Sequence, residues 1–330
     1  MSAGAPTETR PEAWQDSNED TAAGTSWRRR WLLPLVLMAA TLASTLYVGA
    51  EMALERAPAS LAEVGAGASY ALPLMAILLA HEFGHFLAGK YHHVDVSPPY
   101  FIPLPFPPLG TMGAIIRMHG RIRSRNALLD IGAAGPLAGM AVALPVLIYG
   151  LAHSEVLPLP TDGSSFLIEG RSLLYLALLH GMHHIPEGSD IFLGPTAWAG
   201  WVGLLVTMIN LVPFGQLDGG HVAYALWGQR QDAVSRKLLL VLPLIAVAVA
   251  AFYGIPAYLA GVRGDALVTV LLAGVHWLTW AMVLGLMTLF AGSSHPPTED
   301  ATLSPRRRVV AIFTLALFAL LFMPSWMRIT

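Results

Sequence analysis

The feature that most constrains the fold is a set of long apolar stretches. A membrane-spanning helix needs about twenty mostly apolar residues. Stretches of this kind recur at roughly 31–50, 69–90, 128–151, 191–212, 238–260, 266–291 and 309–326. Only 12% of the residues are charged, about half the share of a typical soluble domain. We therefore expect an all-α polytopic membrane protein with about seven transmembrane helices, and an interfacial position for the shorter apolar stretch 172–182.

Lysine and arginine are unevenly distributed among the loops that would join these spans. If the N-terminus lies inside, alternation of the spans puts the connections 91–127, 213–237 and 292–308 inside as well. Of the 19 basic residues, the four that then fall outside are Arg56, Arg171, Arg263 and Arg328. Because cytoplasmic loops carry the excess of lysine and arginine, we expect a cytoplasmic N-terminus.

Composition divides the chain into three parts. Residues 1–26 are polar and hold five acidic residues against a single Arg10, so we expect a disordered cytoplasmic tail. Residues 27–291 would form the membrane-embedded core, and residues 292–330 a cytoplasmic linker and the last transmembrane helix. Organelle transit peptides are poor in acidic residues. We therefore expect a multi-pass protein of a bacterial cytoplasmic (inner) membrane.

The chain contains no cysteine. This excludes disulfides, thiolate zinc sites and a cysteine nucleophile, so a bound transition metal would need His, Asp or Glu ligands. The net charge of −2 gives no reason to expect nucleic acid as a partner.

The second apolar stretch contains the sequence His81-Glu82-Phe83-Gly84-His85. Residues four apart share one face of a helix, so His81 and His85 can bind a single zinc ion. Glu82 lies beside them, where a carboxylate can act as general base towards water. Ionisable residues inside a span are costly and usually functional. The alternative is a histidine pair that hydrogen-bonds to neighbouring helices.

Asp218 is the best candidate for a third ligand, because catalytic zinc usually has three protein ligands and one open position. It follows the apolar stretch 191–212, and Pro213 and Gly215 between them would interrupt a helix and let the backbone turn. With the topology above, the two motif-bearing spans run in the same direction and both motifs approach the inner face. The alternative is an Asp N-cap of a helix that begins near Gly219.

The two motifs together resemble the site-2 protease family of intramembrane zinc metalloproteases. The resemblance covers roughly residues 70–228, and it includes the order of the motifs and the spacing from Asn210 to Asp218. It implies one zinc ion held by His81, His85 and Asp218, with Glu82 as catalytic acid and base. It also implies a role for Asn210 in binding the substrate or the oxyanion, for which the alternative is an Asn that hydrogen-bonds between helices.

Some members of this family carry a PDZ domain between the motif-bearing spans. The stretch 152–190 is too short for one. The segments 110–114 and 130–136 resemble the PDZ-free members found in bacteria and plastids. The implied activity is hydrolysis of transmembrane or membrane-tethered substrates near the cytoplasmic face, with protein substrate and lipid bilayer as the partners.

The segment 98–108 has six prolines and cannot form a regular helix, whereas 110–117 has none and is expected to form a short strand. The family resemblance suggests a re-entrant segment near the zinc, and the alternative is a proline loop that lies on the bilayer. We expect an unwound substrate to pair with the edge of this strand. The residues of that edge are Gly110, Thr111, Met112, Gly113, Ala114 and Ile115.

Other features are weaker. The cluster His180, His183 and His184 could bind metal or simply be solvated. His221, which is close to Asp218 in the sequence, could interact with a metal ligand without binding the metal itself. The spacing of Gly132, Gly135 and Gly139 indicates close helix packing.

Two other functions remain open from the sequence. A membrane metal transporter would carry ligands on several spans, but it has no need of a glutamate placed to activate water. A proteolytically inactive relative that binds membrane partners would be expected to lack one of the four motif residues, His81, Glu82, His85 or Asp218, and all four are present.

Overall fold

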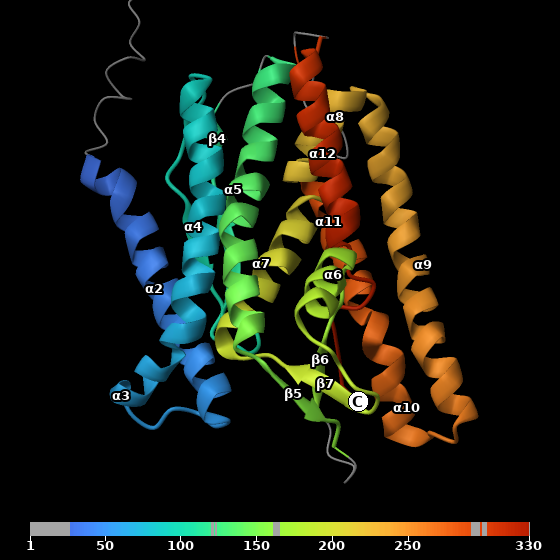
Figure 1. The fold of residues 1–330 in the computed structure, drawn as a ribbon. Helices are drawn as coiled ribbons and strands as arrows, with labels where there is room; N and C mark the ends of the chain where they lie inside the picture. The colour runs from blue at the N-terminus through green and yellow to red at the C-terminus, as the bar shows by residue number, and fades with distance from the viewer. Residues whose placement is uncertain are drawn as a thin grey trace, which may run out of the picture.

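A computed structural model describes residues 27–119, 122, 124–160, 166–291, 298 and 302–329. The predicted tail 1–26 and most of the linker 292–301 lie outside these described residues. The described chain is mostly helical, which confirms the predicted fold class. Its principal helices alternate in direction along a bundle (Figure 1). They are α2 (Trp27–Leu54), α4 (Ala68–Tyr91), α5 (Arg125–Ala152), α7 (Pro195–Asn210), α9 (Arg230–Leu259), α11 (Val275–Ala291) and α12 (Pro305–Leu321).

Among the described residues, five helical segments are long and apolar enough to cross a membrane: Arg30–Leu54, Leu61–Tyr91, Arg125–Ala152, Arg230–Leu259 and Gly264–Phe290. The other two predicted spans are the shorter helices α7, with 16 residues, and α12, with 17. Most of α7 is buried, as expected for a helix that is apolar on all sides. It ends at Asn210, three residues before Pro213, which cannot continue a helix.

Shorter helices connect these segments: α3 (Leu61–Val64), η1 (Gly65–Gly67), α6 (Leu173–Met182), α8 (Asp218–Trp227), α10 (Gly264–Leu271) and η2 (Leu272–Gly274). The predicted short apolar stretch 172–182 is α6. Its Ser172 side chain accepts a hydrogen bond from the Tyr175 amide and so caps the helix.

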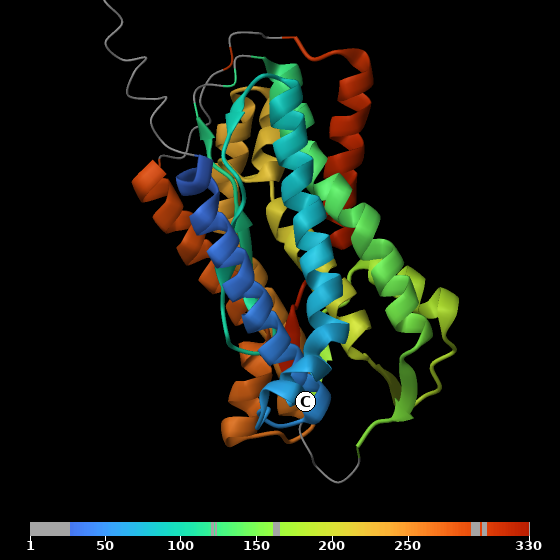
Figure 2. The same ribbon diagram turned by 90° about the vertical axis from the view of Figure 1, so that its left-hand side faces the viewer.

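The two ends of the bundle differ in what they contain (Figures 1 and 2). At one end α4 finishes and α2, α5, α9 and α12 begin. We name it the basic end after Arg30, Lys90, Arg125, Arg230 and Arg307, which lie at these helix termini. At the other end lie β5, β6, β7 and the C-terminal residues, and we name it the strand end.

Helix α5 is the centre of the bundle and packs against α4, α7 and α8. Small residues bring the backbones close together. A Cβ added at Gly200 of α7 would lie 2.6 Å from Leu147 Cα, and one at Gly150 of α5 would lie 2.4 Å from Ala197 Cα. Small residues at helix interfaces permit this close approach in membranes, and around them lie fully buried side chains such as Trp201 and Leu147.

Four antiparallel strand pairs complete the described fold. They are β1 (Asp95–Val96) with β4 (Met118–His119), β2 (Tyr100–Pro103) with β3 (Thr111–Ile115), β5 (Glu155–Pro158) with β7 (Ser189–Phe192), and β6 (Leu167–Glu169) with β8 (Met327–Ile329). The predicted strand in 110–117 is β3. The proline-rich segment also contains a strand, β2, because Tyr100, Phe101 and Ile102 carry backbone donors between the prolines.

The β2–β3 hairpin runs beside α2 and α4 towards the strand end (Figure 2). Buried hydroxyl groups hold its tip. Ser44 donates to the Gly110 carbonyl at 2.7 Å, and Tyr70 donates to the Leu109 carbonyl at 2.7 Å. Gly110 has φ +75°, a conformation that favours glycine. The hairpin therefore packs against α2 and α4 and is fixed at its tip.

Candidate metal centre

Helix α4 places His81 and His85 one turn apart on a buried face. Their side chains are almost fully enclosed, with residue exposures of 3% and 5%. The two Nε2 atoms lie 3.2 Å apart. The predicted helical spacing thus brings both imidazoles to one point.

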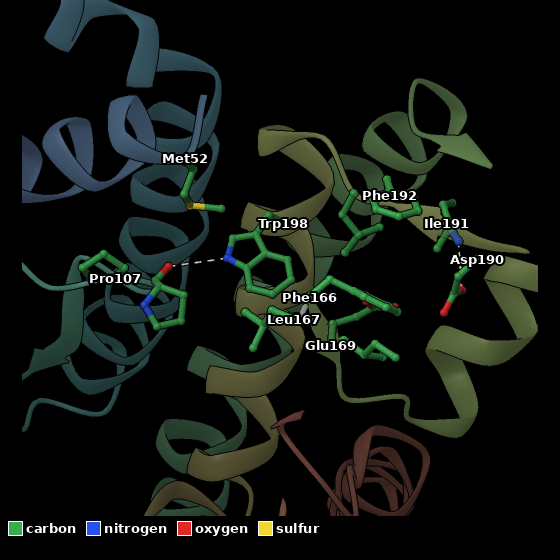
Figure 3. Close-up of a pocket in the computed structure, with 12 residues that line it drawn as sticks. Met52, Pro107, Phe166, Leu167, Glu169, Asp190, Ile191, Phe192 and Trp198 are labelled. Atoms are coloured by element: carbon green, nitrogen blue, oxygen red, sulfur yellow. Dashed lines mark hydrogen bonds between the residues drawn. The ribbon is translucent and has the colours of Figure 1, made fainter. Parts of the chain in front are cut away.

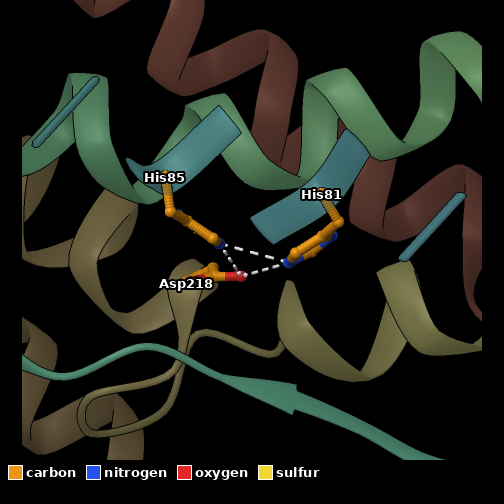
Figure 4. A group of neighbouring side chains, drawn as sticks. All are labelled: His81, His85 and Asp218. Atoms are coloured by element: carbon orange, nitrogen blue, oxygen red, sulfur yellow. Dashed lines mark hydrogen bonds and ion pairs between the residues drawn. The ribbon is translucent and has the colours of Figure 1, made fainter. Parts of the chain in front are cut away.

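Asp218 reaches the same point from another part of the chain. After α7 ends, Pro213 and Gly215, which has φ +49°, turn the backbone, and α8 begins at Asp218 itself. The N-cap is Leu217, so Asp218 is not the capping residue. The Asp218 Oδ2 atom lies 3.2 Å from Nε2 of His81 and 3.2 Å from Nε2 of His85. Figure 4 shows the three side chains pointing towards one another.

The spacing of these three atoms fits a zinc ion. Zinc binds histidine nitrogen and carboxylate oxygen at about 2.0–2.2 Å in tetrahedral geometry. Three ligand atoms on such a tetrahedron lie about 3.3–3.5 Å apart, close to the three distances of 3.2 Å. His81, His85 and Asp218 therefore offer two nitrogens and one oxygen and leave a fourth position for substrate or water.

The second nitrogen of His85 is also placed for metal binding. Its Nδ1 lies 2.7 Å from the carbonyl oxygen of Ile131 on α5. A proton on Nδ1 can be donated to this carbonyl, which leaves the lone pair of Nε2 directed at the metal position. Such hydrogen bonds fix the tautomer and orientation of metal-binding histidines. Ile131 could not be predicted from the sequence, because a backbone carbonyl has no residue signature.

Glycines on α5 make room for the two imidazoles. A Cβ added at Gly135 would lie 2.0 Å from Nε2 of His85, and one at Gly139 would lie 3.2 Å from Nδ1 of His81. Gly84, inside the motif on α4, faces the Ala134 carbonyl, which a Cβ there would approach to 2.4 Å. The α5 glycines that were predicted to allow close helix packing therefore also line the metal site.

Two further predicted residues lie at the centre. Glu82 is buried, with 5% exposure, and is not one of the three residues whose ligand atoms converge. The Asn210 amide nitrogen lies 3.3 Å from Nε2 of His81. The end of α7 therefore contributes a polar group to the same site.

The other histidines are placed differently. His221 is buried where α8 crosses Gly132 of α5, next to the metal group in sequence and space. In the cluster at the end of α6, the His183 ring lies 2.8 Å from the carbonyl of Leu151. Within the described part of the chain, the potential metal group is His81, His85 and Asp218, and the α6 histidines are not among its members.

Proteins named as probable zinc metalloproteases are similar to this chain, and a peptidase family model matches the segment that carries the metal group. The model of Peptidase family M50 matches residues 69–252, which include both motifs. A rice protein named probable zinc metalloprotease EGY2, chloroplastic (Oryza sativa subsp. indica) is 37% identical over 166 residues, covering 48% of this chain and 29% of that protein. The Arabidopsis thaliana protein named probable zinc metalloprotease EGY1, chloroplastic is 36% identical over 174 residues, covering 48% of this chain and 30% of that protein.

These matches cover less than a third of the length of the curated relatives. No solved structure matches the chain. The family match spans more than half of the chain and contains the helices that carry the metal group. The chain therefore belongs to Peptidase family M50.

Proposed function

We propose that this protein is an intramembrane zinc metalloendopeptidase that cleaves transmembrane or membrane-tethered proteins near the cytoplasmic face, as in regulated intramembrane proteolysis. The observation that carries the proposal is the convergence of His81, His85 and Asp218 inside an apolar helical bundle, with Glu82 buried beside the two histidines. The names of the related zinc metalloproteases and the family match support it.

The proposed chemistry assigns one task to each residue. His81, His85 and Asp218 would hold zinc, which would act as a Lewis acid and lower the pKa of a water molecule towards about 7. The Glu82 carboxylate accepts a proton from the attacking water and later delivers it to the leaving amine. The Asn210 side chain, at the edge of the group, donates a hydrogen bond to the substrate carbonyl as negative charge develops on its oxygen.

A helical substrate must unwind before this chemistry can occur. Its peptide carbonyls are hydrogen-bonded within the helix, and each backbone group freed in lipid costs several kcal/mol unless it finds a partner. We infer that the strand β3 supplies those partners through residues 110–115. Met112 and Ile115 are exposed, at 68% and 55%, so the strand presents part of its surface away from the core.

The lengths of the elements support this placement of β3. Tyr70, which fixes the hairpin tip, precedes His81 by eleven residues of helix, or about 16 Å at 1.5 Å per residue. From Gly110 to Ile115 the extended chain also advances about 16 Å, at about 3.3 Å per residue. Both segments run from the tip towards the basic end (Figure 2). A substrate paired along β3 would therefore reach the level of the metal group near Ile115.

The membrane and the orientation of the chain are parts of the proposal. Basic residues at the ends of α2, α4, α5, α9 and α12 lie at one end of the bundle, which supports a cytoplasmic basic end. The metal group lies nearer to this end, because His85 is six residues from the end of α4 at Tyr91. The sequence favours a bacterial cytoplasmic membrane, whereas the matched relatives are named chloroplastic.

A reconstituted cleavage assay paired with zinc analysis tests the proposal. The full chain and its Glu82→Gln variant are purified, their zinc content is measured, and each is placed in vesicles with a single-helix membrane substrate. We expect about one zinc per chain in both proteins and cleavage by the wild type alone. Zinc binding without cleavage by either protein would favour a transporter or an inactive relative, and equal cleavage by both would remove Glu82 from the chemistry.

A further inference from the structure

A cavity at the strand end lies outside the metal centre. It has a volume of about 360 Å³, within the range of ligand-binding pockets. Its wall includes Trp198 at the start of α7, Pro107 and Pro108 of the hairpin tip, and Met52 of α2. Figure 3 shows Trp198 with Pro107 on one side and the strand residues on the other. The cavity therefore joins the hairpin tip to the strands of this end.

Two strands contribute consecutive residues to the wall, residues 166–169 on one side and 190–193 on the other. The first stretch contains β6, which pairs with β8, and the second contains β7, which pairs with β5. In the part of the chain that the structure describes, β6 and β7 are not paired with each other. Each strand therefore has a second edge that its partner strand does not cover, and both strands border the same cavity.

The backbone register shows which groups lie on these second edges. In an antiparallel pair, alternate residues bond to the partner strand. Gly170 donates to the Trp326 carbonyl, so Ile168 faces β8 while Leu167 and Glu169 face away from it. On β7, the amide of Ile191 is bonded to the Asp190 side chain at 2.8 Å instead of to β5. Because this bond occupies the Ile191 amide, the edge open to another strand in the described residues is that of β6 at Leu167. An unpaired strand edge is a template for another extended chain.

Charged side chains determine the net charge beside the cavity. Glu169 and Asp190 are both in its wall, and Arg171 lies between them. Arg171 Nη2 is 2.6 Å from Asp190 Oδ2, and Arg171 Nε is 3.4 Å from Glu169 Oε1. Tyr175 donates to Glu169 Oε1 at 2.9 Å. When both carboxylates are ionised, they leave one negative charge after pairing with the single guanidinium, and this charge beside an apolar cavity favours a cationic residue in the ligand.

The cavity stands at a defined distance from the metal group. Trp198 in its wall and Asn210 beside His81 are twelve residues apart on α7, which corresponds to about 18 Å. An extended peptide covers that distance in about five or six residues. Pro107 and Pro108 connect the cavity directly to the hairpin whose β3 strand runs towards the metal group.

We propose that this cavity is an exosite, a substrate-binding site separate from the metal centre. It takes an extended segment of the protein substrate, about five or six residues on the strand-end side of the cleaved bond, by strand addition to β6. The segment carries a large apolar residue that packs near Trp198 and a lysine or arginine that pairs with the Glu169–Asp190 group. This inference rests on the proposed protease function for the identity of its ligand.

Peptide binding tests the exosite independently of cleavage. The probe is a short fluorescent peptide of alternating leucine and serine with one central lysine, and its partner peptide has norleucine in place of lysine. Binding to the full chain in detergent is followed by fluorescence anisotropy. We expect the lysine peptide to bind about tenfold more tightly than the norleucine peptide, and Glu169→Gln to abolish this preference while Tyr175 retains an acceptor.

The backbone contribution is tested with a pair of variants. Leu167→Pro deletes one amide that faces away from β8, whereas Leu167→Val keeps the amide and a similar apolar side chain. We expect the proline variant to weaken peptide binding at least about tenfold and the valine variant to bind like wild type, with unchanged zinc content in both. If Leu167→Pro fails to fold, the test of the exosite rests on whether Glu169→Gln loses the preference for the lysine peptide over the norleucine peptide.

Three outcomes would overturn the exosite. They are no binding of either peptide, equal binding by Leu167→Pro and wild type, or a protein dimer that the peptides disperse, which would assign the strand edges to a second copy of the chain. The proposed function fails differently. If peptides bind as expected but the wild type cleaves no membrane substrate, the cavity remains a peptide site and the protease assignment is lost.

Discussion

Gly135 illustrates how a single missing Cβ supports the metal centre. Replacing it with alanine would place a methyl group 2.0 Å from Nε2 of His85, so the imidazole or helix α5 must move. Overpacking of this kind costs about 1–3 kcal/mol, and misplacing a metal ligand or its supporting partner lowers metal affinity about 10–100-fold. We predict that Gly135→Ala loses zinc in a competition titration with a chelator.

Gly285 provides the matched control for this change. It lies in helix α11, and an added Cβ there meets no atom within 4 Å. Gly285→Ala should bind zinc like wild type and be equally or more stable, since alanine favours the helix. Equal zinc affinity in Gly135→Ala and Gly285→Ala would show that the approach of α5 to His85 does not matter for the metal.

Asp218 can be tested by metal content. If its carboxylate is the third ligand, Asp218→Ala should lower the zinc content of the purified protein, measured by mass spectrometry, together with its activity. If Asp218 serves only as an acidic residue at the start of α8, its loss costs about 0.3–1 kcal/mol and zinc stays bound. Full zinc occupancy in Asp218→Ala would therefore contradict the proposed ligand set.

The sequence predicts these residues to different degrees. His81 and His85 converge because helical spacing alone brings residues four apart together. Asp218 was predicted from the need for a third ligand and from the topology that brings both motifs to the inner face, and the family resemblance supported it. No local pattern shows that a residue 133 positions later meets His85. The Ile131 carbonyl and the placement of Gly135 against His85 depend on the register between α4 and α5. A register between helices is set by packing across the whole interface, which no short motif encodes.

Strand β3 is the element for which substrate pairing makes the sharpest prediction. Ile115→Pro removes one backbone donor from the strand, while Ile115→Val keeps it and nearly preserves the shape. We expect cleavage to fall much further in the proline variant, with zinc content unchanged in both. Purified protein, a reconstituted helical substrate and zinc analysis suffice for the comparison.

Cross-linking identifies the cause of such a loss. The chain has no cysteine, so single cysteines can be placed along 110–117 and joined to cysteines in the substrate without background. Alternating cross-links along the segment would support strand pairing. Normal cleavage by Ile115→Pro, with no cross-links, would leave the hairpin a structural element only.

The β6–β7 region gives a pH-dependent prediction. Burial raises the pKa of the Glu169 carboxyl above its usual value, although Arg171 and Tyr175 oppose this. Below that raised pKa Glu169 is neutral, and the facing Arg171–Asp190 pair carries no net charge. Above it the group carries one negative charge. The preference for the lysine peptide over the norleucine peptide should therefore grow as pH rises through the Glu169 pKa, and should be independent of pH in Glu169→Gln.

The elements were predictable where their signal is local. Long apolar stretches predict the helices, to within three residues for 128–151 against Arg125–Ala152 and less closely for 238–260 against Arg230–Leu259. The prolines of 98–108 indicate an irregular segment but hide β2. The pairing of β6 with β8 joins residues 167–169 to residues 327–329. Such short strands have no recognisable pattern until the bundle brings them together, so the cavity beside β6 could not be predicted.

At the scale of the whole molecule, two requirements meet in one bundle. An apolar exterior suits lipid, as the exposed Leu240, Leu244, Phe252 and Leu289 on α9 and α11 illustrate. The polar metal group is enclosed by α4, α5, α7 and α8, away from that exterior. The proposed peptide-bond chemistry would therefore occur at membrane depth, nearer to the basic end.

The most direct test of this account is the identification of protein fragments released from membranes. Membranes from cells that contain either the wild type or Glu82→Gln are incubated, and the new chain ends of released fragments are determined by mass spectrometry. The account predicts ends that lie within or beside transmembrane segments, close to the cytoplasmic side, and that are missing with Glu82→Gln. The same fragments with both proteins, or new ends confined to regions far from any membrane segment, would contradict it.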